Sequence, residues 1–178
     1  MADVNFNATK SWASGDAETG ETGGTQEPPV LHYELIELLF FAYRDFISDP
    51  DAILAEYGFG RAHHRVLHFV SRNPGIRVTE LLDILKITKQ SLGRVLKQLV
   101  DEGFIDQRTG LQDRRQRLLY PTAKGEKLSH ELSVPQSLRL EKALSELPEN
   151  GRAIAREFLF HIIDDAERPH VARLASKP

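Results

Sequence analysis

The amino-acid sequence predicts a mainly α-helical protein with one small β-hairpin. Between residues 31 and 168, apolar side chains recur every three or four positions over most of the chain, which is the period of an amphipathic helix. Two short runs interrupt this pattern, FIDQRT at 104–109 and QRLLYP at 116–121, and they flank a glycine-containing loop. The first run is polar enough for a loop, but the two runs together favour a hairpin.

The composition is that of one compact globular domain. The chain has 178 residues, of which 40% are apolar and 28% charged, enough for a single hydrophobic core. It has no run of about 18 apolar residues and no basic segment followed by an apolar one at the N-terminus, so we expect a cytoplasmic protein without a membrane partner. The absence of cysteine excludes disulfides, thiolate nucleophiles and thiolate zinc sites.

The N-terminal part is expected to change from disorder to helix near Pro29. Residues 1–29 are rich in Gly, Thr, Glu and Ser, which bury too little apolar surface to fold, so we expect a disordered tail. A helix should then run from Leu31 to Ser48 and stop at Pro50. Its apolar face is so wide that we expect a second subunit to cover part of it.

Further helices are expected on both sides of the hairpin. Their boundaries follow from amphipathic periodicity, from threonines that can act as N-caps and from glycine or proline at the ends. The expected helices are 61–72, 78–85, one that starts after Thr88 and is closed by Gly103, 122–147 with Thr122 as its cap, and 149–168.

The helix after Thr88 has the two faces that a DNA-reading helix requires. A helix-turn-helix places its second helix in the major groove, so that helix must be apolar behind and polar or basic in front. Leu92, Leu96 and Leu99 supply the apolar face. The front carries residues that can bond phosphates or base edges, namely Lys89, Gln90, Ser91, Arg94, Lys97 and Gln98.

The charge distribution also favours a polyanionic partner. Residues 61–128 contain 14 Lys and Arg against 7 Asp and Glu, whereas the whole chain has a net charge of -3. Such segregation suggests a surface that faces nucleic acid. Gly93 interrupts the basic helix at a cost of about 1 kcal/mol relative to Ala. Close approach of the backbone to DNA or close packing against a neighbouring helix would explain it.

The hairpin loop carries a second basic group. Arg114 and Arg115 follow Asp113, and a hairpin at this place would be the wing of a winged helix-turn-helix. Arginines on a wing can reach the minor groove or the flanking phosphates. Asp113 can hold an arginine in a fixed pose through a charge-assisted pair, whereas Arg117 can be purely structural. Standing alone, the same residues would also fit an ordinary solvated loop.

Residues 65–128 resemble the winged helix-turn-helix of the MarR family of bacterial transcriptional regulators. The strongest markers are Asp113 and Arg115 of the wing and the run Leu119-Tyr120-Pro121-Thr122-x-x-Gly125. The flanking helices fit the family's dimerisation elements, so the resemblance covers about residues 31–168. Two stretches, 58–70 and 86–99, are similar to sequences of one proteobacterial branch of the family, which includes the PetP-type regulators.

The resemblance implies an obligate homodimer with interlocked N- and C-terminal helices. Two winged domains would bind a pseudo-palindromic operator on double-stranded DNA, with half-sites about one turn, or roughly 10 bp, apart. The positions that match the family's motif imply that Arg115 enters the DNA minor groove and that Asp113 orients the Arg115 side chain. They also imply that Ser91 and Arg94 contact DNA. The implied regions are dimerisation helices at 30–60 and 123–168, a DNA-binding domain at 61–122 and a flexible end at 169–178.

The resemblance also implies a ligand-responsive repressor. Family members often bind a small, frequently aromatic anion between the dimerisation helices and the winged domain. Candidate effector residues are Tyr43, Arg44, His63, His64 and His68. His64 and His68, one turn apart, could instead bind zinc with His130 in a metal-responsive regulator. Partly buried helix residues explain these histidines more simply, so we expect no resident metal and no cofactor.

No enzyme is expected from this sequence. It contains no glycine-rich phosphate loop, no His-Glu-x-x-His and no Gly-x-Ser-x-Gly. A remaining alternative is a dimeric winged-helix protein that acts mainly through protein–protein contacts. That role would require loss of basic residues from the expected DNA-reading helix and the wing, and this chain retains them.

Overall fold

A computed structural model describes residues 29–110, 113 and 115–176. Residues from Glu34 onward form one compact unit, separate from the segment before it. The expected tail, apart from Pro29, lies outside the described residues. The elements in chain order are α1 (Tyr33–Glu56), α2 (Arg61–Arg72), β1 (Ile76–Arg77), α3 (Val78–Leu85), α4 (Lys89–Asp101), β2 (Ile105–Thr109), β3 (Arg117–Pro121), α5 (Ala123–Ser145), α6 (Gly151–Ile162) and α7 (Arg168–Ala175).

The three short helices α2, α3 and α4 confirm the sequence prediction. Thr88 caps α4, because its Oγ1 accepts a hydrogen bond from the Ser91 backbone N–H at 3.1 Å. Gly103 lies beyond the end of α4 with φ of 75°, the left-handed conformation that favours glycine. Local signals at both ends of α4 therefore determine its length.

Helix α1 is longer than the sequence predicts, because Pro50 lies inside it instead of ending it. A proline at this position leaves the Phe46 carbonyl without its usual N–H donor four residues later. Gln136 of α5 replaces that donor, with its Nε2 3.3 Å from the Phe46 oxygen. Pro50 itself is buried, so packing against the rest of the unit also favours the continued helix.

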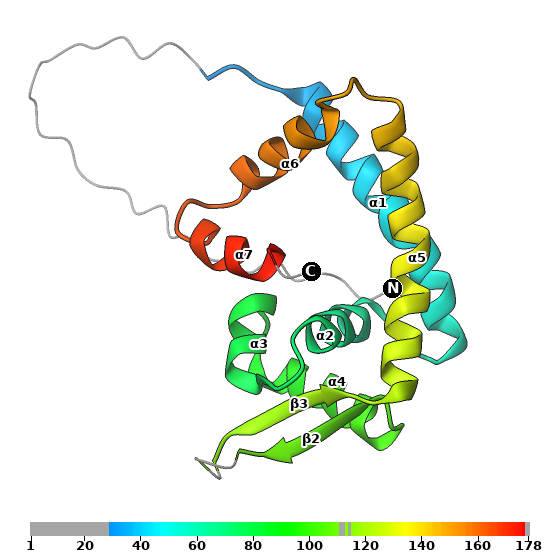
Figure 1. The fold of residues 1–178 in the computed structure, drawn as a ribbon, viewed down its shortest axis with the longest axis vertical. Coiled ribbons are helices and arrows are strands. Elements are labelled where there is room, and N and C mark those ends of the chain that lie inside the picture. The colour runs from blue at the N-terminus through cyan, green and yellow to red at the C-terminus, as the bar shows by residue number, and fades with distance from the viewer. Residues whose placement is uncertain (1–28, 111–112, 114, 177–178) are drawn as a thin grey trace, which may run out of the picture. The chain divides into compact units, whose positions relative to one another are not determined.

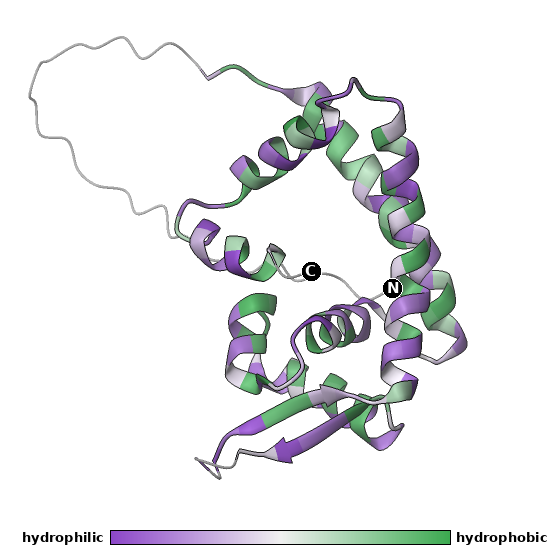
Figure 2. Cartoon of the chain, viewed as in Figure 1, coloured by the Kyte–Doolittle hydropathy of each residue, from purple (hydrophilic) through white to green (hydrophobic). Residues whose placement is uncertain are grey.

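The hydrophobic core lies between α2, α3, α4, the small sheet and the first half of α5. Its fully buried side chains are no more than 1% exposed and come from each of these elements and from the end of α1. Figure 2 shows apolar and polar residues mixed along the helices of the helix-turn-helix, whereas α1 is apolar along much of its length. The fully buried core residues are Leu54, Val66, Leu67, Val70, Leu81, Leu92, Leu99, Phe104, Ile105, Leu119, Leu128 and Leu132.

The sheet has three antiparallel strands in the order β1-β3-β2. Strand β1 was not expected, since two residues carry no periodic signal. The polar-loop interpretation of 104–109 was wrong, because residues 105–109 pair with β3 in a register that sets Gln107 opposite Leu119. Only Ile105 of β2 is buried, which explains why an edge strand of this composition resembles a loop. The hairpin prediction is confirmed.

The C-terminal end is helical where a flexible end was expected. The helix expected at 149–168 ends at Ile162, and a further helix, α7, follows at Arg168–Ala175. The Arg168 guanidinium donates to the carbonyls of Ile163 at 3.0 Å and His161 at 2.7 Å. These bonds satisfy carbonyl groups that the end of α6 would otherwise leave unpaired, and so stabilise the turn into α7.

No helix in the described ranges is both long and apolar enough to cross a membrane.

The junction between the wing and α5 requires a glycine. Thr122 caps α5 by accepting a hydrogen bond from the Gly125 N–H at 3.1 Å, and its own N–H donates to the Phe104 carbonyl at 3.0 Å. A Cβ at Gly125 would lie 2.0 Å from that same carbonyl oxygen. The helix can therefore approach the end of α4 only if residue 125 has no side chain.

Gly125→Ala should lower the free energy of unfolding by about 1–3 kcal/mol or more, because the new methyl group overpacks a rigid backbone contact. The matched control is Gly93→Ala in α4, where a Cβ would meet nothing within 4 Å. The control should raise stability by up to about 1 kcal/mol through helix propensity. Urea unfolding followed by circular dichroism measures both. Equal effects of the two substitutions would contradict this account of the junction.

Candidate nucleic-acid interface

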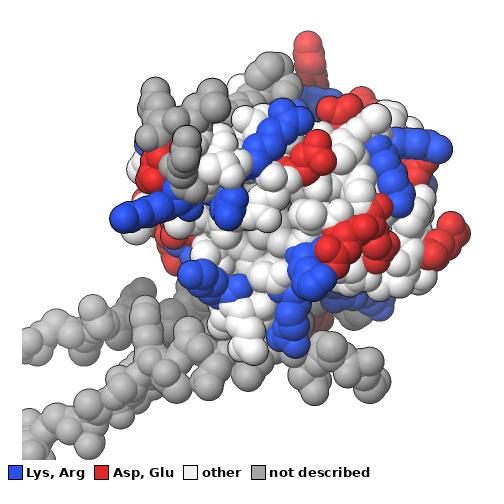
Figure 3. Space-filling view, turned by 90° about the horizontal axis from the view of Figure 1, so that it is seen from below, with Lys and Arg blue, Asp and Glu red and all other residues white. Residues whose placement is uncertain are grey.

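An open groove of about 780 Å³ lies between α3, α4 and the wing. Basic side chains dominate its charged lining, with one carboxylate among them. Figure 3 views the end of the molecule that carries α4 and the wing, and it shows Lys and Arg spread over this face with acidic side chains beside several of them. The charged lining residues are Arg77, Lys89, Lys97, Asp101, Arg115 and Arg117.

The exposed face of α4 carries cations that the protein leaves unpaired. Lys89, Gln90 and Arg94 are exposed, and within the described ranges their side chains make no hydrogen bond or ion pair. Ser91 is half-buried, and its hydroxyl accepts a hydrogen bond from Thr88 Oγ1 at 2.9 Å at the start of the helix. Lys89 and Arg94 are thus the α4 cations most available to an external anion.

The C-terminal half of α4 differs from the sequence prediction. Lys97 is exposed, as expected, but its ammonium pairs with Asp101 one turn later. Gln98, expected on the outer face, is half-buried and accepts a hydrogen bond from His63 of α2 at 2.9 Å. Its amide nitrogen donates to Glu102 at 2.9 Å. Gln98 therefore ties α4 to α2 instead of facing outward.

Gly93 lines the groove and is exposed. The interpretation that it permits close packing of a neighbouring helix is wrong, because a Cβ at this position would meet nothing within 4 Å. Because residue 93 has no side chain, the backbone of α4 is accessible from the groove at this position. Close approach of DNA to the backbone at Gly93 stays a prediction.

The wing is shaped by backbone hydrogen bonds. The Asp113 carboxylate accepts from the Arg115 backbone N–H at 2.9 Å, and the Asp113 carbonyl accepts from the Gln116 N–H at 3.0 Å. The expected ion pair with an arginine side chain is absent for Arg115 in the described part of the wing, so Asp113 positions the loop and not the guanidinium. A Cβ at Gly110 would lie 2.8 Å from the Asp113 carbonyl oxygen.

Arg115 is exposed on the wing and lines the groove between α3, α4 and the wing, and its predicted contact with the DNA minor groove stays a prediction. Arg114, expected to contact phosphate, lies outside the described residues. Arg117 also lines the groove, and its guanidinium donates to Thr109 Oγ1 of the paired strand at 2.8 Å. Among the described wing residues that line the groove, Arg117 is therefore held by a hydrogen bond within the protein and Arg115 is not.

Arg77 and Gln107 belong to the groove although the sequence interpretation did not select them. Arg77 precedes α3, where its backbone N–H and its guanidinium both bond Glu80 at 2.9 and 2.8 Å. A basic residue directly before a helix-turn-helix was the signal available for Arg77. Gln107 had no such signal, since only the strand pairing of β2 brings it to the groove.

The predicted effector residues are not gathered at one site. Tyr43 and Arg44 lie on the exposed half of α1, where Arg44 pairs with Asp45 at 2.8 Å. His63 is used within the protein: its Nδ1 accepts from the Gly60 N–H at 3.1 Å, so its Nε2 carries the proton and donates to Gln98. Its ring also stacks on Phe59 at 4.6 Å. His63 is therefore a structural residue.

Two half-buried histidines follow on α2. Burial lowers the pKa of His64 and of His68, and a nearby positive charge acts in the same direction, His68 on His64 and Arg72 on His68. Across the residues that can be described, no three His, Asp or Glu side chains are grouped as a metal site. Among the residues that the structure describes, His64 and His68 therefore have no third ligand with which to bind zinc.

Comparison with known proteins identifies the family of this chain. Residues 57–116 match the sequence profile of the MarR family. The chain is 43% identical over 161 residues to the HTH-type transcriptional regulator PetP of Rhodobacter capsulatus, which covers 89% of this chain and 97% of that protein. This chain belongs to the MarR family. Because that family consists of transcriptional regulators, the chain is not an enzyme, and the predicted likeness to PetP is confirmed.

Solved structures share the fold of this MarR-family regulator. Streptococcus pneumoniae FabT in complex with DNA has a TM-score of 0.66 at 17% identity, with 74% of this chain and 94% of that chain covered. A putative MarR-family regulator of Listeria monocytogenes, complexed with 26mer DNA, has a TM-score of 0.62 at 23% identity, with coverage of 71% and 85%. The crystal structure of MarR has a TM-score of 0.59 at 23% identity, with coverage of 84% and 99%.

The lowered histidine pKa values predict a loss of stability in mild acid. The folded chain binds fewer protons at His64 and His68 than the unfolded chain does, so stability is full above the usual histidine pKa of about 6.5 and falls as the pH drops toward the lower folded-state values. The free energy of unfolding, measured in urea, should fall between pH 7.5 and 5.5. A His64→Gln/His68→Gln variant should lose less over that interval, and an unchanged loss would refute the assignment.

Proposed function

We propose that this protein is a sequence-specific DNA-binding repressor that binds a pseudo-palindromic operator as a homodimer and responds to a small ligand. The single observation that carries the proposal is the groove between α4 and the wing, where Lys89 and Arg115 face outward. In this proposal residues 61–122 bind DNA, and the helices within 30–60 and 123–168 form the dimer. The two relatives crystallised with DNA support the same use of the fold.

The groove has the features that a duplex requires. In a helix-turn-helix the second helix enters the major groove while neighbouring groups contact phosphates. Here Lys89 and Arg94, at the start and middle of α4, make no ion pair within the described part of the chain, and Gly93 leaves the backbone open. Arg115 lines the same protein groove from the wing. An arginine on a wing can reach the minor groove of bound DNA. We assign Gln90 and Ser91 to base-edge or phosphate contacts on the same helix turn.

Unpaired cations also argue against a role limited to protein–protein contacts. A protein-binding surface is depleted of charged residues at its centre, because desolvating an unpaired charge is costly. A phosphate backbone supplies the matching anions and releases counterions when cations contact it. The lining of this groove therefore fits nucleic acid better than an apolar protein surface.

The dimer proposal rests on the apolar surface of α1, α5 and α6. On α1 alone, Leu38, Phe40 and Phe41 are each more than half exposed. Contiguous apolar surface of this kind is rare on a soluble monomer and marks an interface. The other exposed apolar residues on these helices are Tyr33, Leu35, Ile36, Leu39, Tyr43, Val134, Leu138, Leu140, Ile154, Phe158, Leu159 and Ile162.

Arg115→Ala should weaken binding to the specific operator by about 1–3 kcal/mol, because a groove contact to base edges is lost. Lys97→Ala should mainly reduce the dependence of affinity on salt, with a slope smaller by about one, as expected for a phosphate contact. The operator would be selected from genomic fragments, and mobility shifts at several salt concentrations would measure both effects.

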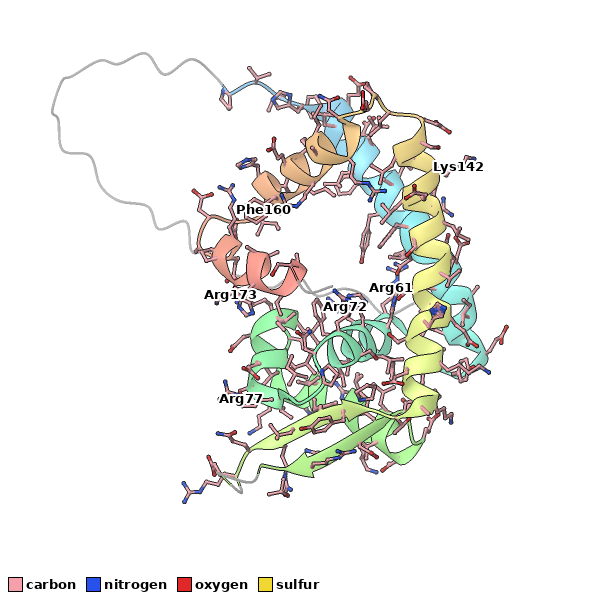
Figure 4. The ribbon with its side chains drawn as sticks, viewed as in Figure 1. Arg61, Arg72, Arg77, Lys142, Phe160 and Arg173 are labelled. Atoms are coloured by element: carbon pink, nitrogen blue, oxygen red, sulfur yellow. The ribbon has the colours of Figure 1, made fainter. Side chains whose placement is uncertain are left out.

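Lys142→Ala is the matched control for these substitutions, since Lys142 lies at the end of α5 remote from the wing (Figure 4) and should leave both measurements unchanged. Failure of the parent protein to form any sequence-specific complex at about 100 mM salt would refute DNA binding. Equal and negligible effects of Arg115→Ala and Lys97→Ala would refute the assigned roles.

Phe40→Glu should convert the dimer into a monomer, because it places a charge within the apolar surface of α1. The side chain is 69% exposed in the single chain, so its replacement should not disturb the core around α2 and α4. Ala52→Glu adds the same charge at an exposed position of the same helix and should remain dimeric. Sedimentation velocity distinguishes the two, and a monomeric parent protein would overturn the dimer proposal.

A further inference from the structure

Helix α7 lies against the helix-turn-helix of its own chain (Figure 1). Its residues Val171 and Leu174 are half-buried and line an open cavity of about 470 Å³, whose other side is formed in part by Phe69 of α2 and Ile84 of α3. No residue of α7 is fully buried. The contact is therefore loosely packed, and a few substitutions can release α7 without opening the core.

An ion pair joins the start of α7 to the turn of the helix-turn-helix. The carboxylate of Glu167, directly before α7, lies 3.0 Å from the ammonium of Lys86, directly after α3. Lys86 has φ of 50°, the one positive φ at a non-glycine residue in the described ranges. Glycine adopts this conformation at lower cost. The pair with Glu167 gives a reason for a long cationic side chain at this position.

The turn between α6 and α7 is fixed by Arg168. Its guanidinium donates to the carbonyls of His161 at 2.7 Å and Ile163 at 3.0 Å. The same guanidinium lies 2.7 Å from the Asp165 carboxylate. Because one planar group bonds three acceptors, the turn is held in one shape. Residues 163–175, the C-terminal connection, thus join the end of α6 to the turn between α3 and α4.

Helix α5 provides another connection between the winged domain and the helices proposed to form the dimer. Its buried residues Gly125, Leu128 and Leu132 lie in its first half, which packs against α2 and β3. A rigid body that is joined at one place can pivot there, whereas a second connection at another place removes that freedom. The ion pair at Lys86 provides the second place, since it acts on the turn between α3 and α4.

We propose that the C-terminal connection fixes the position of each helix-turn-helix relative to α6, and so fixes the distance between the two α4 helices of the dimer. Glu167 is then a positioning residue that acts through Lys86. A dimer with this connection intact binds one spacing of operator half-sites and discriminates against others. The inference rests on the proposed function, because it requires a dimer that binds DNA.

The first test examines the contact of α7 without DNA. The chain has no cysteine, so two introduced thiols have no competitors. In full-length Lys86→Cys/Glu167→Cys, a short bismaleimide should link the two positions within one chain. Mass spectrometry of the monomer band from a denaturing gel detects the linked peptides. Lys86→Cys/Lys142→Cys is the matched control, since Lys142 lies at the far end of α5 (Figure 4), and it should give no link. Absence of the first link, or equal yields in both variants, overturns the contact.

The second test measures discrimination between half-site spacings. Mobility shifts compare the selected operator with derivatives that have one base pair inserted or deleted at the centre. One base pair rotates one half-site by about 35° relative to the other. The parent protein should therefore bind the derivatives at least about 10-fold more weakly than the operator. A parent protein that binds all three DNAs equally overturns the inference and leaves the proposed DNA-binding function intact.

Glu167→Lys/Leu174→Lys should release α7, because it places cations beside Lys86 and beside Arg72 of the same cavity. Both positions are changed because the Lys86 and Glu167 side chains are 63% and 39% exposed, and such a pair alone contributes little. Discrimination between spacings should fall below about 3-fold. Unchanged discrimination in this variant overturns the role of α7.

The matched control is Glu131→Lys/Ser145→Lys, which adds the same charge on α5. The Glu131 ion pair, with Lys127, lies within that one helix, so its loss separates no two elements. This control should keep the discrimination of the parent protein, and an equal loss in the control overturns the inference. The ratio of affinities is the readout, because a change in general attraction to phosphate alters binding to all three DNAs alike.

Lys86→Gly is a second variant that does not endanger folding. It removes the ion pair at a position where φ of 50° favours glycine, so circular dichroism should show an unfolding midpoint at least as high as that of the parent protein. Discrimination between spacings should nevertheless fall by about 2-fold, in line with the small contribution of an exposed pair. Full discrimination in Lys86→Gly overturns the role of the pair.

Discussion

The rest of the structure depends on the burial of Phe104 between α4 and α5. Its carbonyl oxygen accepts the Thr122 N–H at 3.0 Å, and its backbone N–H donates to Leu99 at 2.8 Å. Its ring is 1% exposed and lies edge-on to Phe59 at 5.1 Å, with the Lys124 ammonium 4.0 Å from its centroid. One residue thus joins the end of α4, the wing and the start of α5.

From Phe104 a chain of contacts leads to the exposed face of α4. Phe59 stacks on His63, and His63 donates to Gln98. Because Gln98 is held on the inner side, rotation of α4 about its axis is restricted, and Lys89 and Arg94 are directed outward. The orientation of the cations thereby follows from buried aromatic packing. Charge alone would not select it, since exposed ion pairs contribute little energy.

Two surfaces of the molecule differ in their chemical character. The groove between α4 and the wing is basic, whereas α1 and the outer faces of α5 and α6 are apolar and exposed. In the proposed function, the first surface binds a polyanion and the second binds another copy of the chain.

The sequence by itself determined the family and the helices around the groove between α3, α4 and the wing. Helices α2, α3 and α4, the cap at Thr88 and the glycine at residue 103 depend on local periodicity and local hydrogen bonds, which a linear pattern records. Only the tertiary structure decided that Pro50 stays within a helix, because its compensating donor, Gln136, is distant in the chain. The tertiary structure likewise decided that Gln98 faces α2, where it bonds His63, and that the Asp113 carboxylate accepts a backbone hydrogen bond within the wing. Each of these outcomes depends on three-dimensional partners or loop geometry that periodicity does not encode.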